Sequence, residues 1–161
     1  MGCSPNGCEV SESMTSILNE IMTVLTQPNI FMLGMHGSNN KRKGNVVEKV
    51  TRRVQRDNLF DMVVMATVKK KPDLRRIQGE LGNMLGVQLQ EKTLEARATR
   101  LCDRIKMEEK ILIILNDLSG AINLDKIGIP FGNDHKGCKI LLVSHNQQVF
   151  NQMKTQIEVS V

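Results

Sequence analysis

The chain has 161 residues, of which 40% are hydrophobic and 24% are charged. This composition is typical of one folded domain and excludes an intrinsically disordered chain, and a net charge of +5 permits anionic ligands without requiring nucleic acid. No apolar run reaches the roughly 18 residues that a membrane-spanning helix needs, so the sequence predicts a cytoplasmic protein without a transmembrane segment.

The first twelve residues are polar and are predicted to form a flexible N-terminal segment. Gly2 and Cys3 follow the first methionine, where myristate and palmitate could be attached and would hold the chain at a membrane surface. Asn6 stands where the acceptor pattern has Ser or Thr, which favours an unmodified end.

Amphipathic helices alternate with short apolar runs along the rest of the chain. The predicted helices cover residues 13–25, the segment from Val46 to about residue 56, 74–85, 94–105 and 147–153, and the predicted strands cover 29–33, 60–68, 111–115, 139–143 and 157–161. This alternation predicts an α/β fold, with a parallel sheet of about five strands flanked by helices. We expect residues 111–115 to lie beside residues 30–33 near the centre of the sheet.

The segment after the first predicted strand has the layout of a phosphate-binding loop. The run Gly34–Gly37 is predicted to turn, and the polar stretch 38–45 leads to the helix that is predicted to begin at Val46. In P-loop proteins, a glycine-rich turn and a helix N-terminus hold phosphate with backbone N–H groups, in the pattern G-x-x-x-x-G-K-[ST]. The complete pattern is absent here, so the sequence predicts a P-loop NTPase-like fold with an altered loop.

The apolar run 111–115 ends in Asn116 and Asp117. Ligands of open parallel sheets bind at the carboxyl ends of the strands, and in P-loop enzymes an Asp at this place organises Mg²⁺. Asp117 is therefore the candidate metal-binding residue. The alternative is that the Asn-Asp pair only begins a loop.

Two basic triplets, Lys41-Arg42-Lys43 and Lys69-Lys70-Lys71, raise the possibility of nucleic-acid binding. Both lie in predicted loops without neighbouring aromatic residues, which is more typical of a solvated surface. We therefore predict no specific nucleic-acid partner.

Several motifs, taken in order, resemble the NB-ARC domain of plant disease-resistance proteins of the coiled-coil class. These motifs are Leu59-Phe60-Asp61, Met65-Ala66-Thr67-Val68, Ile77-Gln78-Gly79-Glu80, Met84-Leu85-Gly86, Ile111–Asp117, Gly128-Ile129-Pro130-Phe131-Gly132 and His135–Leu142. The resemblance extends from about Met14 to Val161. It implies a module that binds ADP or ATP with Mg²⁺ and switches between the two in plant defence, acting with other resistance or signalling proteins.

The family's loop pattern, G-M-G-G-V-G-K-T-T, can be matched to this chain in two ways. Counted forward from Gly34, Asn39 and Asn40 take the places of the last glycine and the lysine. Counted backward from the helix, Lys43 takes the place of the lysine and Arg42 that of the glycine. The difference between the two counts predicts a lengthened loop. The candidate nucleotide-binding residues are Gly34, Met35, Gly37, Lys41, Lys43, Gly44 and Asn45.

Other departures concern catalysis. Asn116 replaces an acidic residue of the family, and His145 replaces the arginine of its T-S-R motif. These changes predict weakened nucleotide binding and no catalytic residues, although the family contains slow ATPases. Because the ARC segment and leucine-rich repeats do not follow, residues 13–161 are interpreted as the nucleotide-binding part of a truncated chain. The alternative is a non-catalytic interaction partner of full-length resistance proteins.

Overall fold

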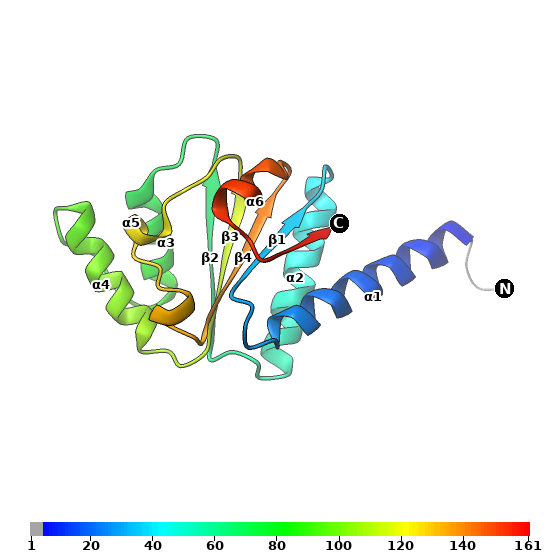
Figure 1. Ribbon diagram of the computed structural model, residues 1–161, viewed down its shortest axis with the longest axis horizontal. Helices are drawn as coiled ribbons and strands as arrows, with labels where there is room; N and C mark the ends of the chain where they lie inside the picture. Colours follow the sequence, from blue (N-terminus) through cyan, green and yellow to red (C-terminus); the bar gives the residue numbers. More distant parts are fainter. Residues whose placement is uncertain (1–4) are drawn as a thin grey trace.

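The computed structural model describes the backbone of residues 5–161 and the side chains of residues 13–161. Five strands form one parallel sheet, and helices cover both faces (Figure 1). The strands are β1 (Met32–His36), β2 (Met62–Lys69), β3 (Ile111–Leu118), β4 (Cys138–Ser144) and β5 (Ile157–Ser160). The helices are α1 (Pro5–Leu25), α2 (Asn40–Arg56), α3 (Leu74–Met84), α4 (Leu94–Lys106), α5 (Leu124–Ile127) and α6 (Gln148–Met153), with the 3-10 turn η1 (Gly132–Asp134). The predicted fold class is confirmed.

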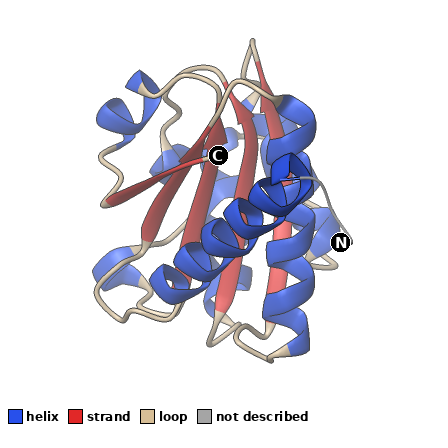
Figure 2. Cartoon of the chain, turned by 90° about the vertical axis from the view of Figure 1, so that its right-hand side faces the viewer, coloured by secondary structure: helices blue, strands red, loops and turns tan. Residues whose placement is uncertain are grey.

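The sheet separates two hydrophobic cores, because successive strand residues point to opposite faces. On β3, Ile111 and Ile113 pack toward α3, α4 and α5, whereas Leu112 and Ile114 pack toward α1 and α2. Figure 2, which is turned to the side of α1 and α2, shows these two helices lying across the sheet. Since both faces are covered, the strands read in sequence as continuous apolar runs.

The strand order is β2-β3-β4-β1-β5, which makes β4 the central strand. The prediction that β3 and β1 are neighbours is wrong, because β4 lies between them and pairs with both. A continuous apolar run identifies a strand that is buried on both faces. Because β3 and β4 both have such a run, the pattern does not show which of them lies next to β1. The order depends on the crossover connections, which periodicity does not encode.

The predicted turn at Gly34 is also wrong, because β1 begins at Met32 and continues through Gly34 and Met35 to His36. Gly34 is required there by close packing rather than by a turn. A Cβ atom on Gly34 would lie 2.8 Å from the ring of Phe150, which comes from α6. The loop therefore begins only at Gly37.

We expect Gly34→Ala to lower the free energy of unfolding by about 1–3 kcal/mol, because the added methyl group overpacks a buried contact. Gly44→Ala is the matched control: Gly44 is exposed within α2, and nothing lies within 4 Å of its Cβ position. That substitution should raise stability by about 0.5–1 kcal/mol, the helix-propensity difference. Urea unfolding of both variants measures the effects, and equal shifts in the two would contradict the packing argument.

The first two helices begin earlier than predicted. Helix α1 begins at Pro5 rather than at Ser13, and the proposed acylation sites Gly2 and Cys3 lie outside the described residues. Helix α2 begins at Asn40 rather than at Val46, because the carboxamide of Asn39 caps it by accepting the N–H of Arg42 at 3.0 Å. No described helix has an apolar stretch long enough to cross a lipid bilayer.

Candidate functional site

The sequence-predicted site residues converge on the edge of the sheet where the parallel strands end, at the top of Figure 1. Gly37 follows β1, Asp117 is the last residue but one of β3, and His145 follows β4. Because β4 pairs with both β1 and β3, one strand separates Gly37 from Asp117. Helix α2 begins three residues after Gly37, so its N-terminus lies at the same edge.

Unsatisfied backbone donors gather at the start of α2. The N–H of Gly37 donates to the carbonyl of Ser144, and the N–H of Lys43 donates to the carbonyl of Asn39. Between them, the N–H groups of residues 38–41 make no hydrogen bond to any described residue. Open N–H groups at the positive end of a 17-residue helix form a site that favours an anion.

Lys43 lies beneath this loop. The residue is only 5% exposed, and its Cγ atom lies 3.6 Å from the Cβ position of Gly37. Burial lowers the pKa of Lys43, and the charge of Asp117 offsets part of that effect. Within the described part of the chain, the Lys43 ammonium group makes no hydrogen bond or ion pair, and its nitrogen keeps some contact with solvent although the residue as a whole is buried. A positive charge at the mouth of the loop is therefore left for an anion to neutralise.

The positions of β1 and α2 distinguish between the two ways of matching the loop pattern. Because Gly34 and Met35 are buried in β1, the forward count places the loop inside the sheet. The backward count makes Gly37 the first glycine, and Lys43 then follows six residues later, the spacing of G-x-x-x-x-G-K. Arg42 and Gly44 take the places of the second glycine and of the Ser or Thr. Counted in this way, the pattern fits without an extra residue.

The remaining loop candidates lie on the outside of α2. Lys41 is in the first turn with an exposed side chain, and Gly44 and Asn45 are exposed in the second turn. Lys43 is thus the buried residue of the basic triplet, and sequence alone left the choice between Lys41 and Lys43 open.

Asp117 is exposed and has a left-handed backbone conformation, with φ of 55°, where the pairing of β3 with β4 becomes irregular. Asp tolerates this conformation better than most residues. Its carboxylate raises the pKa of Lys43, so the two charged groups interact across the site. Asn116, which precedes it, is half-buried and carries no charge.

Ser144 has a structural role that the sequence did not reveal. It is buried at the end of β4, where its hydroxyl donates to the carbonyl of Leu118 and accepts the N–H of Asn146 at 2.9 Å. These bonds join the ends of β3 and β4 beside Asp117. A polar residue directly after an apolar strand was the available signal, but its bond to Leu118, 26 positions earlier, could not be read from the local sequence.

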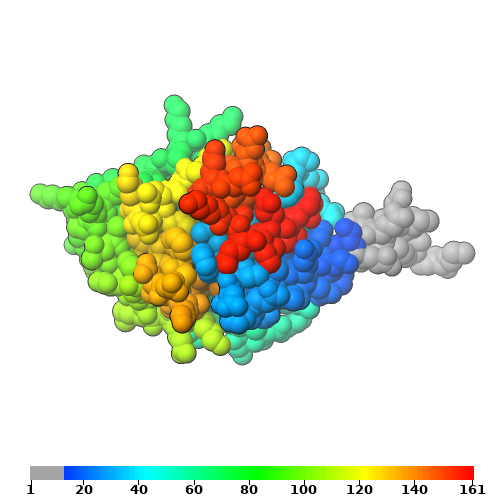
Figure 3. Space-filling view, in the orientation of Figure 1, coloured from blue at the N-terminus to red at the C-terminus, as the bar shows by residue number. Residues whose placement is uncertain are grey.

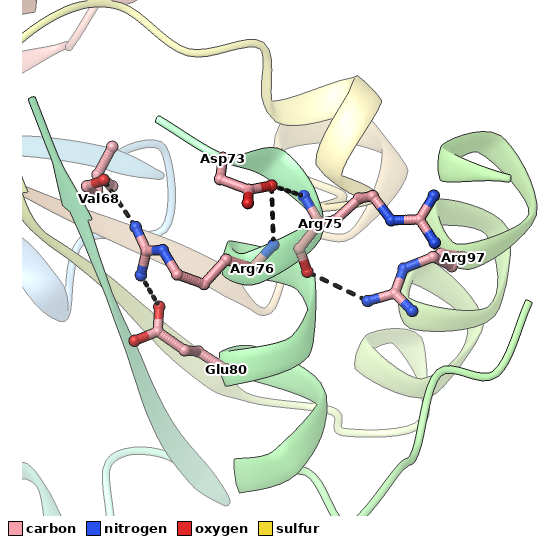
Figure 4. Close-up of polar contacts among 6 residues, drawn as sticks. All are labelled: Val68, Asp73, Arg75, Arg76, Glu80 and Arg97. Atoms are coloured by element: carbon pink, nitrogen blue, oxygen red, sulfur yellow. Dashed lines mark hydrogen bonds and ion pairs between the residues drawn. The ribbon is translucent and has the colours of Figure 1, made fainter. Parts of the chain in front are cut away.

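Several arginines near the second basic triplet are used inside the protein (Figure 4). The guanidinium group of Arg76 donates to the carbonyl of Val68 at 2.8 Å and to Glu80 at 2.7 Å. Arg97 donates to the carbonyl of Arg75 at 3.1 Å. These contacts join β2, α3 and α4, so the positive charges stabilise the fold rather than forming an exposed basic face.

A five-stranded parallel sheet with an open helix N-terminus and a buried lysine after β1 defines a P-loop nucleotide-binding fold. Solved structures agree in fold. Cdc6p from Pyrobaculum aerophilum matches 93% of this chain and 44% of its own with a TM-score of 0.63 at 13% identity. The Aeropyrum pernix ORC2 protein, solved as ADPNP–ADP complexes, matches 99% of this chain and 48% of its own with a TM-score of 0.55 at 16% identity.

The NB-ARC domain family model matches residues 12–161, so the chain belongs to the NB-ARC family. Among curated relatives, Disease resistance protein At4g27190 from Arabidopsis thaliana is 30% identical over 98% of this chain, and Disease resistance protein SUMM2 from the same plant is 24% identical over 91%. The chain spans 16% and 17% of the lengths of these two relatives. The resemblance predicted from the motifs is confirmed.

Proposed function

We propose that this chain binds ADP or ATP, with the phosphates at the N-terminus of α2, as the nucleotide-dependent switch module of a disease-resistance protein. The observation that carries the proposal is the presence, side by side, of open N–H groups at residues 38–41 and of the unpartnered ammonium group of the largely buried Lys43. Membership of the NB-ARC family supports it. A polyphosphate would satisfy both kinds of donor at once.

The residues present fit a nucleotide and its Mg²⁺ ion in part. Lys43 would neutralise phosphate charge, and the exposed Asp117 would bind Mg²⁺ through its water shell. Gly34 and Met35 would act only through the packing of β1. Gly44 provides no hydroxyl group for the metal, and Arg42 places a long side chain where a second glycine would let the loop approach the phosphates.

We expect a stepwise repair of the loop to raise affinity for ADP. Gly44→Thr restores a metal-binding hydroxyl and should tighten ADP binding about tenfold in Mg²⁺, since one charge-assisted contact contributes roughly 1.5 kcal/mol. Gly44→Ala is the matched control, because it fills the same open position without a hydroxyl. Calorimetry with ADP, in Mg²⁺ and in EDTA, measures both variants against the unaltered chain, and adenosine serves as the phosphate-free ligand.

We expect Gly44→Thr to bind ADP more tightly than the unaltered chain in Mg²⁺ but not in EDTA. Gly44→Ala should not change ADP affinity in either condition. Adenosine binding as tightly as ADP would contradict a phosphate site. No heat with ADP from either the unaltered chain or the Gly44→Thr variant would overturn the proposed function. Hydrolysis is not part of the proposal, because Asn116 and His145 lack the charges that would stabilise the transferring phosphate.

A second candidate function does not depend on nucleotide. The chain would then act as an interaction partner of other resistance or signalling proteins. A cavity at the opposite edge of the sheet favours this role, and its chemistry limits the kind of partner.

A further inference from the structure

A cavity of about 780 Å³ lies at the edge of the sheet opposite to the proposed nucleotide site. Its walls are the segments that lead into four strands: residues 26–31 before β1, 59–60 before β2, Lys110 before β3 and 131–137 before β4. Figure 3 shows two of these walls, the blue segment near residue 30 and the orange segment near residue 135, on the face toward the viewer. None of the predicted nucleotide-binding residues lines this cavity.

Aromatic side chains gather in the cavity although they are scarce in the chain. The sequence has four Phe and no Tyr or Trp, and Phe31, Phe60 and Phe131 line this one cavity. The rings of Phe31 and Phe131 stack with centroids 5.6 Å apart. Gly132 has a φ of 63° and lies against the ring of Phe31, where a Cβ atom would be 3.6 Å away. All three Phe side chains are half-buried, so part of each ring remains open to a ligand.

The rim of the cavity is positively charged. Its described lining includes Lys110, Lys136 and Lys139, and includes no Asp or Glu. The ammonium group of Lys139 donates to the carbonyls of Gln27 and Ile30, and it thereby fixes the wall before β1. Lys110 and Lys136 are exposed, and neither side chain makes a hydrogen bond or ion pair within residues 13–161. Two free cations therefore flank an aromatic floor.

Glu109 precedes Lys110 and Asp134 lies two positions before Lys136, but neither carboxylate lines the cavity or forms an ion pair with these lysines. Two other acidic groups nearby are used in separate contacts. The carboxylate of Asp61 accepts the backbone N–H of Lys110 at 3.1 Å, and Glu108 pairs with Arg104 at 3.1 Å. The positive charge of the rim is thus not cancelled by ion pairs across the cavity.

We propose that this cavity is a docking site for an acidic peptide segment of a partner protein, anchored by a bulky apolar side chain. Protein interfaces combine a buried aromatic or aliphatic anchor with a charged rim, which is the arrangement of Phe31, Phe60 and Phe131 below Lys110 and Lys136. The rim repels a basic segment and attracts an acidic one. The site is independent of nucleotide binding.

The test uses fluorescein-labelled hexapeptides and the full chain, with fluorescence anisotropy as the readout. Asp-Glu-Leu-Phe-Glu-Asp carries both the acidic flanks and the anchor. Lys-Lys-Leu-Phe-Lys-Lys reverses the flanks, and Asp-Glu-Ser-Ser-Glu-Asp removes the anchor. We expect only the first peptide to bind, with an affinity that falls as salt is raised.

Charge-reversal variants locate the site. The double variant Lys110→Glu with Lys136→Glu should weaken binding of the acidic peptide at least about tenfold. The double variant Lys70→Glu with Lys71→Glu is the matched control, since it makes the same change of net charge at exposed residues outside the cavity. Circular dichroism verifies that both variants are folded.

Equal weakening by the two double variants, or equal binding of the peptide without its anchor, would show general charge attraction and overturn the proposal. Absence of binding by the acidic peptide up to about 1 mM would also overturn it. Addition of ADP should leave the anisotropy unchanged, so failure here and failure of nucleotide binding are separate results.

Discussion

Replacement of Lys43 by methionine is expected to weaken ADP binding by about 10–100-fold while leaving the folded state at least as stable. The ammonium group of Lys43 is the cation of the proposed phosphate site, and its loss removes a charge-assisted contact that contributes roughly 1.5–3 kcal/mol. Methionine keeps a chain of similar length and fills the same buried space. Calorimetry with ADP measures the first effect, and thermal unfolding of the free protein measures the second.

The Lys43→Met variant should be more stable than the unaltered chain, because burial lowers the pKa of Lys43 below its ordinary value of 10.5. Below the folded-state pKa, the charged ammonium group destabilises the free protein. Between the two pKa values the unfolded chain binds the proton more tightly, so the stability of the unaltered chain increases with pH across that window. The Lys43→Met variant should lack this increase.

Lys41→Met provides the matched control, because Lys41 lies in the same helical turn with an exposed side chain. It should change ADP affinity only slightly. If Lys41→Met weakens binding as much as Lys43→Met does, the buried lysine is not the phosphate contact and the backward count of the loop has no functional meaning.

Replacement of Gln78 by alanine is expected to lower the free energy of unfolding by about 2–4 kcal/mol, an exceptional effect for one polar residue. Gln78 is completely buried in α3, and its amide nitrogen lies within hydrogen-bonding distance of the carbonyls of Leu94, Lys126 and Ile127. Its side-chain oxygen accepts the Nε–H of Arg97 at 3.0 Å. Alanine would leave these groups without partners where α3, α4 and α5 meet.

Urea unfolding measures the loss, and Gln55→Ala is the control because Gln55 is exposed on α2. Gln78→Glu separates the two halves of the network, since it retains an acceptor for Arg97 and loses the donors to the carbonyls. It should also be destabilised. A change below about 0.5 kcal/mol for Gln78→Ala, similar to that of ordinary surface substitutions, would mean that water replaces the amide.

The sequence predicted five strands because each is a short apolar run between turns, and it predicted five of the six described α-helices, the four longer ones from apolar spacing. It misplaced the start of α2, whose first six residues carry no apolar side chain and whose cap is a single Asn. It missed α5, which has only four residues. Local patterns are therefore sufficient for long amphipathic elements and insufficient where one capping bond or one short turn decides.

The sequence predicted which segments would form the proposed site, but it did not predict correctly which of their residues lie in the strand and which in the loop. Gly34 was interpreted as a loop glycine because glycine usually interrupts strands, whereas its role depends on the ring of Phe150, 116 positions later in the chain. The burial of Lys43 under Gly37 likewise depends on how α2 packs against the sheet. Contacts between residues distant in sequence decided both positions, and no pattern within the loop contains them.

The position of β1 in the sheet has a consequence for biosynthesis. Strand β1 hydrogen-bonds only to β4 and β5, and neither begins before Cys138. During translation, β1 therefore cannot form its strand hydrogen bonds until more than one hundred later residues have been synthesised. The β2–β3 pair can form sooner, together with α3 and α4. We conclude that this half of the sheet assembles first on the ribosome, and that the nucleotide-binding half closes last.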